Sequence, residues 1–448
     1  MLEITKQERE APDYNLLRLK LGIKVTAWSD RMLAALENGV KGNKWFSLID
    51  KITSNNTVLT AWELVKKNKG SAGVDKVTIE KFEAKYPQYL AEMQKEIRED
   101  KYKSLQIRRK HIDKGDGKMR PLGIPCVRDR IVQCAIKLII EPIFENEFAE
   151  TSYGFRPGRG CKDALRKVQE NLDQGYIYVV DADLKSYFDT IPHDKLMDNI
   201  QEKIADGRVL NLIQGFLKQG ILEECKEWIP TEGTPQGAVL SPLLANIYLH
   251  PLDQLMESKG YKMVRYADDF VVMCQTIEEA QKAFSIIKIW TQDNGLILHP
   301  DKTHIGNCQI PGQGFEFLGY RFENGERHVR KKSLNKLKDK IRERTKRNNG
   351  YSLDHTIRKL NPMLIGWFGY FKHAHKWTFE RLDGWIRRRL RAMLKRREKG
   401  RGMGKTMKDH IKWPNKYFAN LGLFSLEEAY KKALCALKTK GSVPIPMR

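Results

Sequence analysis

The 448-residue sequence predicts a chain of several packed units in the α/β (α+β) class, and three observations support this. Hydrophobic residues make up 41% of the chain, which is enough to bury sizeable cores. An apolar, β-rich run at residues 176–184 ends in acids, and two short β-type runs at 262–266 and 270–274 enclose two more. After residue 320 the pattern is helical to the C-terminus, with a glycine-rich break at 400–404.

The N-terminal half supplies the other expected elements. Residues 1–55 have a helical, mixed-charge pattern to which we assign no chemistry. The helical pattern continues over residues 56–110, broken by a loop at 70–75. A basic strand at 106–112, a glycine-containing turn and a second strand ending at Pro125 follow, and then helices to about residue 172.

Positive charge is concentrated in one part of the chain. Lys and Arg number 80 against 56 Asp and Glu, a net charge of +24. Residues 331–410 hold 25 Lys and Arg against 7 Asp and Glu, so this window supplies +18 of that total. Such an excess favours a polyanionic partner, either nucleic acid or an anionic membrane, although most charge runs are simply solvated faces.

A membrane role is disfavoured by the sequence. Apolar windows such as residues 131–140 include Gln133 and Lys137 and are too short to span a bilayer. No apolar stretch follows a basic N-terminus, and the seven cysteines contain no C-x-x-C pair. We therefore expect a reduced, cytoplasmic, soluble protein that binds nucleic acid.

Two pairs of acids suggest metal-dependent chemistry. Asp181 and Asp183 end the β-rich run, and Asp268 and Asp269 lie in the expected hairpin turn. Carboxylates brought together repel each other unless a cation holds them, and oxygen ligands favour Mg²⁺, with Mn²⁺ as an alternative. Two such ions about 4 Å apart can activate a hydroxyl and stabilise leaving pyrophosphate. Each acid alone would fit a turn or a helix cap equally well.

Residues 266–269 read Y-A-D-D, which resembles the Y-x-D-D hairpin of reverse transcriptases. Residues 183–189, D-L-K-S-Y-F-D, resemble their first catalytic segment. Further segments resemble those of group II intron reverse transcriptases in family order: R-P-L-G-I-P at 120–125, S-Y-G-F-R-P-G-R at 152–159, G-T-P-Q-G at 233–237, S-P-L-L-A-N at 241–246 and F-L-G-Y at 317–320.

The resemblance extends beyond the polymerase segments. Residues 366–371, G-W-F-G-Y-F, and 384–390, G-W-I-R-R-R-L, are similar to the maturase (thumb, or X) region of group II intron proteins. Retrons and diversity-generating elements generally lack this region. The sequence contains no C-terminal Cys/His cluster of the H-N-H nuclease type. In this respect the chain resembles bacterial, group IIC-like intron proteins, which lack the H-N-H endonuclease domain.

The resemblance implies a right-hand polymerase with an antiparallel-sheet palm. We expect an N-terminal extension at 1–55, fingers at 56–175, palm at 176–320, thumb at 321–399 and a DNA-binding segment at 400–448. The helical pattern at 425–437 equally fits a capping helix on the thumb. The implied activity is RNA-directed DNA synthesis from deoxynucleoside triphosphates, with an RNA template, intron RNA and a DNA primer or target as partners.

Catalytic roles follow from the matched positions. Asp183 and Asp268 are the implied ligands of two Mg²⁺ ions, with Asp269 beside them and the Leu184 carbonyl as a further ligand. Lys302 resembles a lysine that protonates leaving pyrophosphate, although a surface salt-bridge lysine explains it equally well.

The nucleotide pocket is implied by four positions. Lys114 and Arg120 match the cations that hold the triphosphate, although each also fits a solvated turn residue, and Gln236 matches a residue lining the pocket. Phe188 matches the bulky ring that excludes a 2′-hydroxyl; its alternative is a core aromatic. The chain departs from the family at Asp113, which places a negative charge near the triphosphate.

Nucleic-acid contacts are expected from two groups of arginines. Arg156 and Arg159 match template-side positions. Helical periodicity places Arg387, Arg388 and Arg391 on the basic faces of an amphipathic helix that would lie along phosphates.

Two other functions remain open at this point. A splicing maturase needs the basic thumb and the fingers but not the carboxylates, so the chain could bind intron RNA without polymerase use. A domesticated enzyme in DNA repair or phage defence is the third hypothesis. The sequence does not specify the oligomeric state.

Overall fold

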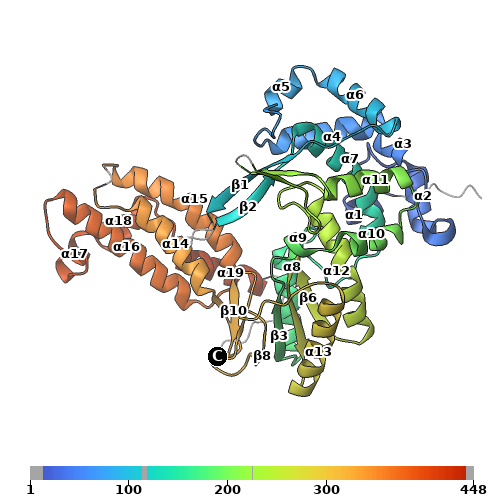
Figure 1. The fold of residues 1–448 in the computed structure, drawn as a ribbon. Helices are drawn as coiled ribbons and strands as arrows, with labels where there is room; N and C mark the ends of the chain where they lie inside the picture. Colours follow the sequence, from blue (N-terminus) through green and yellow to red (C-terminus); the bar gives the residue numbers. More distant parts are fainter. Residues whose placement is uncertain (1–13, 114–118, 224–225, 349, 440–448) are drawn as a thin grey trace, which may run out of the picture. The chain divides into compact units, whose positions relative to one another are not determined.

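The computed structural model describes residues 14–113, 119–223, 226–348 and 350–439, which belong to two compact units (Figure 1). Unit 1 comprises Met1–Tyr176 and Ala182–His304, and unit 2 comprises Ile177–Asp181 and Ile305–Arg448. The division passes through strand β3 (Tyr178–Asp183). The five-part division expected from the sequence remains a prediction.

Unit 1 is mostly helical, and polar side chains begin several of its helices. Ser54 accepts a hydrogen bond from Thr57 N at 3.2 Å, and Thr276 accepts one from Glu279 N at 3.2 Å, which satisfies otherwise unpaired N–H groups. The helices are α1 (Asn15–Leu21), α2 (Asp30–Asn38), the 3₁₀ helix η1 (Lys41–Asn43), α3 (Ile49–Ile52), α4 (Asn55–Asn68), α5 (Ile79–Glu83), α6 (Tyr86–Arg98), α7 (Val127–Glu145), α8 (Cys161–Asp173), α9 (Tyr187–Thr190), α10 (His193–Gln201), α11 (Gly207–Leu217), α12 (Ser241–Ser258) and α13 (Ile277–Asp293).

The strand pair expected before residue 125 is confirmed. β1 (Ile107–Asp113) and β2 (Met119–Ile124) form an antiparallel hairpin. β1 also pairs in parallel with β4 (Ile221–Glu223), which pairs with β5 (Lys226–Trp228), so the sheet order is β2-β1-β4-β5.

The expected hairpin around the Y-A-D-D segment is also confirmed. β6 (Lys262–Tyr266) and β7 (Asp269–Cys274) pair antiparallel in a sheet of order β6-β7-β3-β8, where β8 is His304–Asn307. Helices α8 and α12 pack against β6, and α13 packs against β7 (Figure 1). Phe270, Val271 and Val272 are all fully buried, so β7 is covered on both faces, which explains its continuous apolar run.

Helix α7 forms much of the core of unit 1. Ile131, Ile136 and Ile140 are fully buried although they lie on different faces of the helix. Helix α4 packs along it. A helix that is apolar all round belongs in a core, which accounts for the apolar window that is too short to cross a membrane. In the part of the chain that the structure describes, no helix is both long and apolar enough to span a bilayer.

Unit 2 begins with strands rather than with the helices expected after residue 320. Its three-stranded antiparallel sheet has the order β11-β10-β9, and the stacked rings of Phe315 and Phe322 lie 4.9 Å apart in its core. The elements are β9 (Phe315–Phe317), β10 (Tyr320–Glu323), β11 (Glu326–Val329), α14 (Lys331–Arg344), α15 (Leu353–Phe371), α16 (Trp377–Arg397), α17 (Met407–Lys412), α18 (Asn415–Asn420) and α19 (Leu426–Thr439).

Helix α19 packs on α15 and α16. The carboxylate of Asp383, on α16, accepts hydrogen bonds from Ser425 Oγ at 2.7 Å, Leu426 N at 3.1 Å and Glu427 N at 3.1 Å. This carboxylate therefore caps the N-terminus of α19. Helix α19 is thus held against α15 and α16, and both interpretations of this segment, a capping helix on the thumb and a DNA-binding segment, stay predictions.

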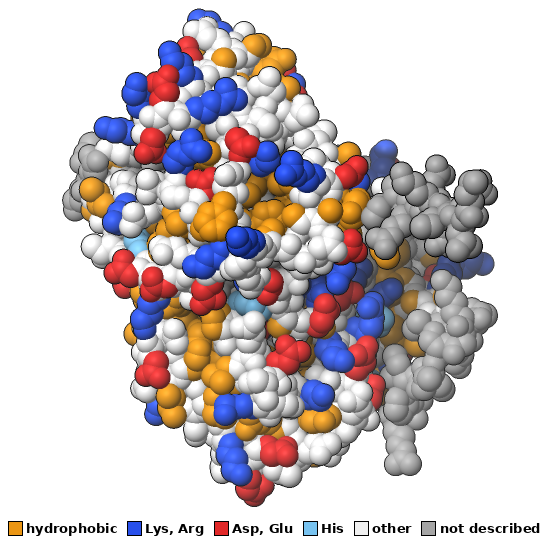
Figure 2. Space-filling model, turned by 90° about the vertical axis from the view of Figure 1, so that its right-hand side faces the viewer, with side chains coloured by type: hydrophobic (Ala, Val, Ile, Leu, Met, Phe, Trp, Pro, Cys, Tyr) orange, Lys and Arg blue, Asp and Glu red, His pale blue; other side chains and the backbone are white. Residues whose placement is uncertain are grey.

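The distribution of charge on one visible face is mixed. Figure 2 shows Lys and Arg side chains interspersed with Asp and Glu, with apolar side chains between them. Among the described residues that are visible in Figure 2, this face shows no continuous basic surface.

Candidate active site

The Y-A-D-D segment forms a tight turn that carries Asp268. Tyr266 pairs with Asp269 at the end of the β6–β7 ladder, so only Ala267 and Asp268 lie in the turn. Ala267 has a φ of 60°, a value that two-residue hairpin turns require but that is strained for a residue with a Cβ. Strain of this kind persists only where neighbouring groups hold it in place.

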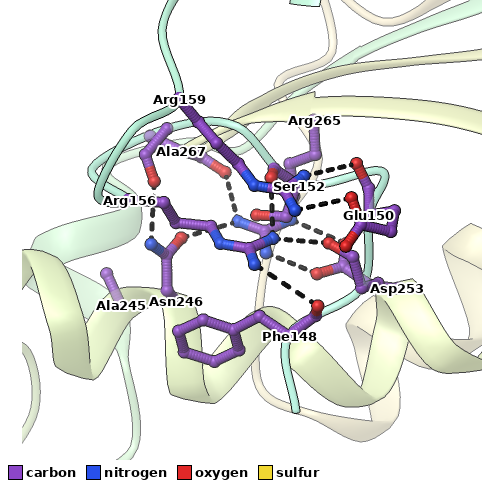
Figure 3. A network of polar contacts seen from close by, with 12 residues as sticks. Phe148, Glu150, Ser152, Arg156, Arg159, Ala245, Asn246, Asp253, Arg265 and Ala267 are labelled. Carbon is purple, nitrogen blue, oxygen red and sulfur yellow. Dashed lines mark hydrogen bonds and ion pairs between the residues drawn. The ribbon is translucent and has the colours of Figure 1, made fainter. Parts of the chain in front are cut away.

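Arg265 holds the strained turn through a buried network (Figure 3). Its guanidinium donates to the Ala267 carbonyl at 3.1 Å and to Asn246 Oδ1 at 3.0 Å. Arg265 Nε also donates to Asp253 Oδ1 at 2.7 Å, and Nη2 contacts the other carboxylate oxygen. Both side chains of this ion pair are 0% exposed. The pair therefore fixes the turn with fully desolvated, charge-assisted hydrogen bonds.

The S-Y-G-F-R-P-G-R loop lies directly against the same turn. A Cβ on Gly154 would lie 2.3 Å from Ala267 N, so only glycine permits this approach. Asn246 Nδ2 donates to the Gly154 carbonyl at 2.8 Å, and Tyr153 N donates to the Arg265 carbonyl at 2.9 Å. The loop, the turn and helix α12 are thus joined at one point.

Asp183 is brought to the site by the end of β3. Beyond the strand, Leu184 pairs with Leu298, flanked by hydrogen bonds from His299 N to the Asp183 carbonyl and from Lys185 N to the Ile297 carbonyl, each 2.8 Å. The Leu184 carbonyl takes part in neither of these two bonds. The Asp183 side chain is 19% exposed, so it reaches the surface of the site.

The Asp183 carboxylate is close enough to affect the pKa of Asp268. Burial raises the pKa of Asp268 above its ordinary value, and the negative charge of Asp183 raises it further. Positive charge on Lys302 and Arg120 acts in the opposite direction. Two acids and two cations from separate segments therefore converge here. Asp269, half-buried, follows at the start of β7.

The donor chemistry of this site fits divalent cations. No group of three or more His, Cys, Asp and Glu is arranged as a metal site in the described residues. The repulsion between Asp183 and Asp268 is nevertheless the kind that a hard cation relieves, and the donors are all oxygen atoms. The expected role of Asp183 and Asp268 as metal ligands stays a prediction.

Lys302 lies at the catalytic acids, with its ammonium Nζ in contact with Asp183 Oδ2. The His299 backbone bond to β3 anchors the loop that carries it. The Lys302 side chain is 60% exposed, so the ammonium lies at the mouth of the site. This ion pair is what the salt-bridge interpretation predicts, and the role of Lys302 toward pyrophosphate stays a prediction.

Phe188 is half-buried, whereas its neighbour Tyr187 is buried and donates from its hydroxyl to the Ala245 carbonyl at 2.6 Å. The Phe188 ring lies edge-on to Phe155, with centroids 6.3 Å apart. The backbone carbonyl of Phe188 accepts a 2.6 Å hydrogen bond from Thr234 N. Tyr187 is thus the core aromatic of the pair, and Phe188 is partly accessible, as a pocket residue must be.

Arg120 and Gln236 lie together. Arg120 Nε donates to Gln236 Oε1 at 2.8 Å, and Gln236 Nε2 donates to Asp189 Oδ2 at 3.1 Å. Two of the expected pocket residues are thus in direct contact. Lys114, the other expected triphosphate-binding cation, lies outside the described residues.

The expected template contact at Arg156 is wrong. Its side chain is 2% exposed and forms a bidentate ion pair with Glu145, at 2.8–3.0 Å, and a hydrogen bond to the Ala149 carbonyl. It also donates to the Ser152 carbonyl at 2.8 Å (Figure 3). A guanidinium with these partners in a buried position has no donor to offer a phosphate. Arg159 is also engaged, with Glu150 at 2.5 Å, and its side chain is 18% exposed.

The expected nucleic-acid contact at Arg391 is also wrong. Arg391 is 2% exposed and donates to the Trp413 carbonyl at 2.8 Å and to Asn415 Oδ1 at 2.7 Å, so it joins α16 to Trp413 and to the first residue of α18. Arg387 is partly exposed and lies 3.9 Å from Asp383. Arg388 is half-buried, and its nucleic-acid role stays a prediction.

Sequence reasoning missed the groups that support the site. Arg265 directly precedes the Y-A-D-D segment, and its partner Asp253 lies twelve residues before Arg265. No local periodicity in the sequence indicates that residues at this spacing form a pair. Glu145 and Asp189 were missed for the same reason, because their partners are distant in sequence. An arginine inside an otherwise apolar strand was the available indication that a buried acid would be needed.

Comparisons with known proteins agree with this geometry. The family model for reverse transcriptase (RNA-dependent DNA polymerase) matches residues 112–322, and the group II intron, maturase-specific domain matches residues 334–413. The first of these matches contains both catalytic acids, and the second lies almost wholly within the basic window.

Curated relatives are similar over large parts of the chain. Protein YkfC of Escherichia coli (strain K12) is 33% identical over 315 residues, covering 61% of this chain and 82% of that protein. The group II intron-encoded protein LtrA of Lactococcus lactis subsp. cremoris is 32% identical over 320 residues, covering 56% of this chain and 51% of that protein. An uncharacterized 91 kDa protein in the cob intron of Schizosaccharomyces pombe is 45% identical over 151 residues, covering 34% of this chain and 19% of that protein. The chain has an α/β polymerase fold and belongs to the family of group II intron reverse transcriptases and maturases.

Proposed function

We propose that the chain is an RNA-directed DNA polymerase that adds deoxynucleotides to a primer 3′-end on an RNA template. The observation that carries this proposal is the convergence of Asp183 and Asp268 in unit 1, where the negative charge of Asp183 raises the pKa of Asp268 and Lys302 contacts Asp183. Acids placed in this way suit metal-assisted nucleotidyl transfer. The match to the reverse transcriptase family over residues 112–322 supports the same reaction.

Asp183 and Asp268, with the Leu184 carbonyl and Asp269 beside them, would hold Mg²⁺. When bound, a pair of such ions activates the primer hydroxyl and stabilises the charge on leaving pyrophosphate. Mn²⁺ has compatible oxygen chemistry. Lys302 is placed to supply a proton to the pyrophosphate, because its ammonium already lies at Asp183.

The pocket residues account for selection of the nucleotide. Arg120, close enough to affect Asp268, supplies a guanidinium suited to a triphosphate. Phe188 presents a half-buried ring beside the segment that carries Gln236, where a ring would exclude a 2′-hydroxyl. These placements support a preference for deoxynucleotides.

A second function, binding of intron RNA to assist splicing and mobility, is favoured by the maturase-specific match at residues 334–413. The +18 excess in residues 331–410 supports phosphate binding by the same segment. In the mobility function, DNA would be a second partner, either as the primer that is extended or as the target of insertion. The similarity to proteins of Escherichia coli and Lactococcus lactis supports a bacterial, cytoplasmic setting.

Primer extension separates the two functions. Purified protein is incubated with Mg²⁺, an RNA template annealed to a DNA primer, and the four deoxynucleoside triphosphates. We expect extension by wild-type protein and by Asp198→Asn, a control that removes an exposed acid of α10, and none by Asp268→Asn. RNA binding and splicing support should survive in Asp268→Asn. Full extension by Asp268→Asn would refute the assignment of the catalytic acids.

A further inference from the structure

Asp189 completes a chain of three polar side chains beside the catalytic acids. Gln236 is at its centre, with Arg120 of β2 on one side and Asp189 of α9 on the other. The two hydrogen bonds measure 2.8 Å and 3.1 Å. All three residues belong to unit 1. In sequence, Asp189 lies 47 residues from Gln236 and Arg120 lies 116 residues from it.

The charges at the two ends determine which way the Gln236 amide faces. A carboxylate accepts hydrogen bonds only, so Asp189 takes the NH₂ group of the amide. A guanidinium donates only, so Arg120 takes the oxygen. An amide flanked in this way has one favourable orientation, and both bonds are charge-assisted. Without Asp189, the amide keeps only its bond to Arg120, and its NH₂ group is free to rotate.

The backbone joins the same two segments around Phe188. Thr234 N donates to the Phe188 carbonyl at 2.6 Å, and Gly233 N donates to the Ile191 carbonyl at 2.8 Å. Gly233 has a φ of 86°, and a Cβ there would lie 2.8 Å from the carbonyl carbon of Asp189. The G-T-P-Q-G segment therefore lies against the backbone of α9 at Phe188 and Asp189, and against Ile191 just after that helix.

We propose that Asp189 is a positioning residue for substrate selection. Its carboxylate orients the Gln236 amide, and through the amide it aligns Arg120 for the triphosphate and holds the G-T-P-Q-G segment against Phe188. This inference rests on the proposed polymerase function and extends it, because it assigns the choice of deoxynucleoside triphosphate to a residue that contacts no reacting atom.

Steady-state kinetics of single-nucleotide addition test the proposal with the full chain. Asp189→Ala removes an exposed side chain, so folding should be preserved. We expect the KM for deoxynucleotides to rise about threefold to tenfold, since a charge-assisted bond is lost at a solvent-exposed position, with kcat changed less than about twofold. Preference for deoxynucleotides over ribonucleotides should fall. Asp198→Ala, which removes an exposed acid from α10, should match wild type.

A double-mutant cycle shows whether Asp189 acts through Gln236. If it does, Asp189→Ala causes no further rise of KM in a Gln236→Ala background, and Asp189→Glu, which keeps the carboxylate, recovers part of the loss. The proposal is overturned if Asp189→Ala leaves KM and sugar preference unchanged, lowers kcat alone, or adds its full effect to that of Gln236→Ala. Failure of the polymerase function itself is distinguishable, because wild-type protein would then show no addition.

Discussion

Removing Asp253 should destabilise the protein strongly because it leaves Arg265 as an unpaired buried cation. Both side chains are 0% exposed, and Asp253 accepts two of the hydrogen bonds that the guanidinium donates. Breaking such a pair costs about 3–5 kcal/mol, a large part of the roughly 5–15 kcal/mol by which domains are stable. We expect Asp253→Ala to lower the midpoint of urea unfolding accordingly. Glu170→Ala, which breaks an exposed ion pair with Lys167 on α8, should cost less than about 0.5 kcal/mol.

A double substitution separates stability from catalysis. Asp253→Leu combined with Arg265→Met removes both charges and should regain most of the stability, since apolar replacements of a buried pair are often neutral or stabilising. Primer extension should remain impaired, because the Ala267 carbonyl loses its donor and the turn carrying Asp268 is no longer held. A loss below about 1 kcal/mol in Asp253→Ala, or full extension by the folded double variant, would contradict this reasoning.

Three further predictions concern the turn, the acids and the thumb. Gly154→Ala should lower kcat for primer extension at least tenfold, because the new Cβ would meet Ala267 N at 2.3 Å; unchanged kcat would show that the loop can move away. Because the pKa of Asp268 is raised in the folded protein, its ionised form destabilises the fold at neutral pH. With a chelator present, Asp268→Asn should therefore melt at a higher temperature than wild type. This difference in melting temperature should shrink as the pH falls toward the pKa of the carboxyl in the unfolded chain. Arg396→Ala, at an exposed position of α16, should reduce the slope of log RNA affinity against log salt by about 1, whereas Arg391→Ala should lower stability; the reverse result would relocate the RNA surface.

Local patterns predicted the elements of the catalytic hairpin correctly. The β6 and β7 strands lie where two short β-type runs enclose Asp268, and β3 lies in the apolar run that ends at Asp183. Such runs are decided by side-chain alternation and burial over a few residues, which a sequence displays directly. The strands β10 and β11 were missed. Tyr320 and Phe322 alternate with charged residues in β10, but each strand has only four residues, which is too short a run to establish a period.

The same local view misassigned two arginines. In the sequence, Arg156 and Arg391 lie in basic segments and are indistinguishable from their exposed neighbours. In the structure, the first pairs with Glu145, and the second binds the backbone of Trp413. Long arginine side chains can be satisfied by buried acids and carbonyls, and only the packing of distant segments shows which ones are.

The sequence by itself determined the chemistry of this protein: the two separated acids, the order of the polymerase segments and the concentration of positive charge after residue 330. These depend on residue types and short spacings. The tertiary structure alone decided what supports that chemistry, namely the buried Arg265–Asp253 pair beneath the strained turn and the orientation of Gln236 by Asp189. These two contacts join residues 12 and 47 positions apart, and folding brings them together because polar groups in the folded chain require complementary partners.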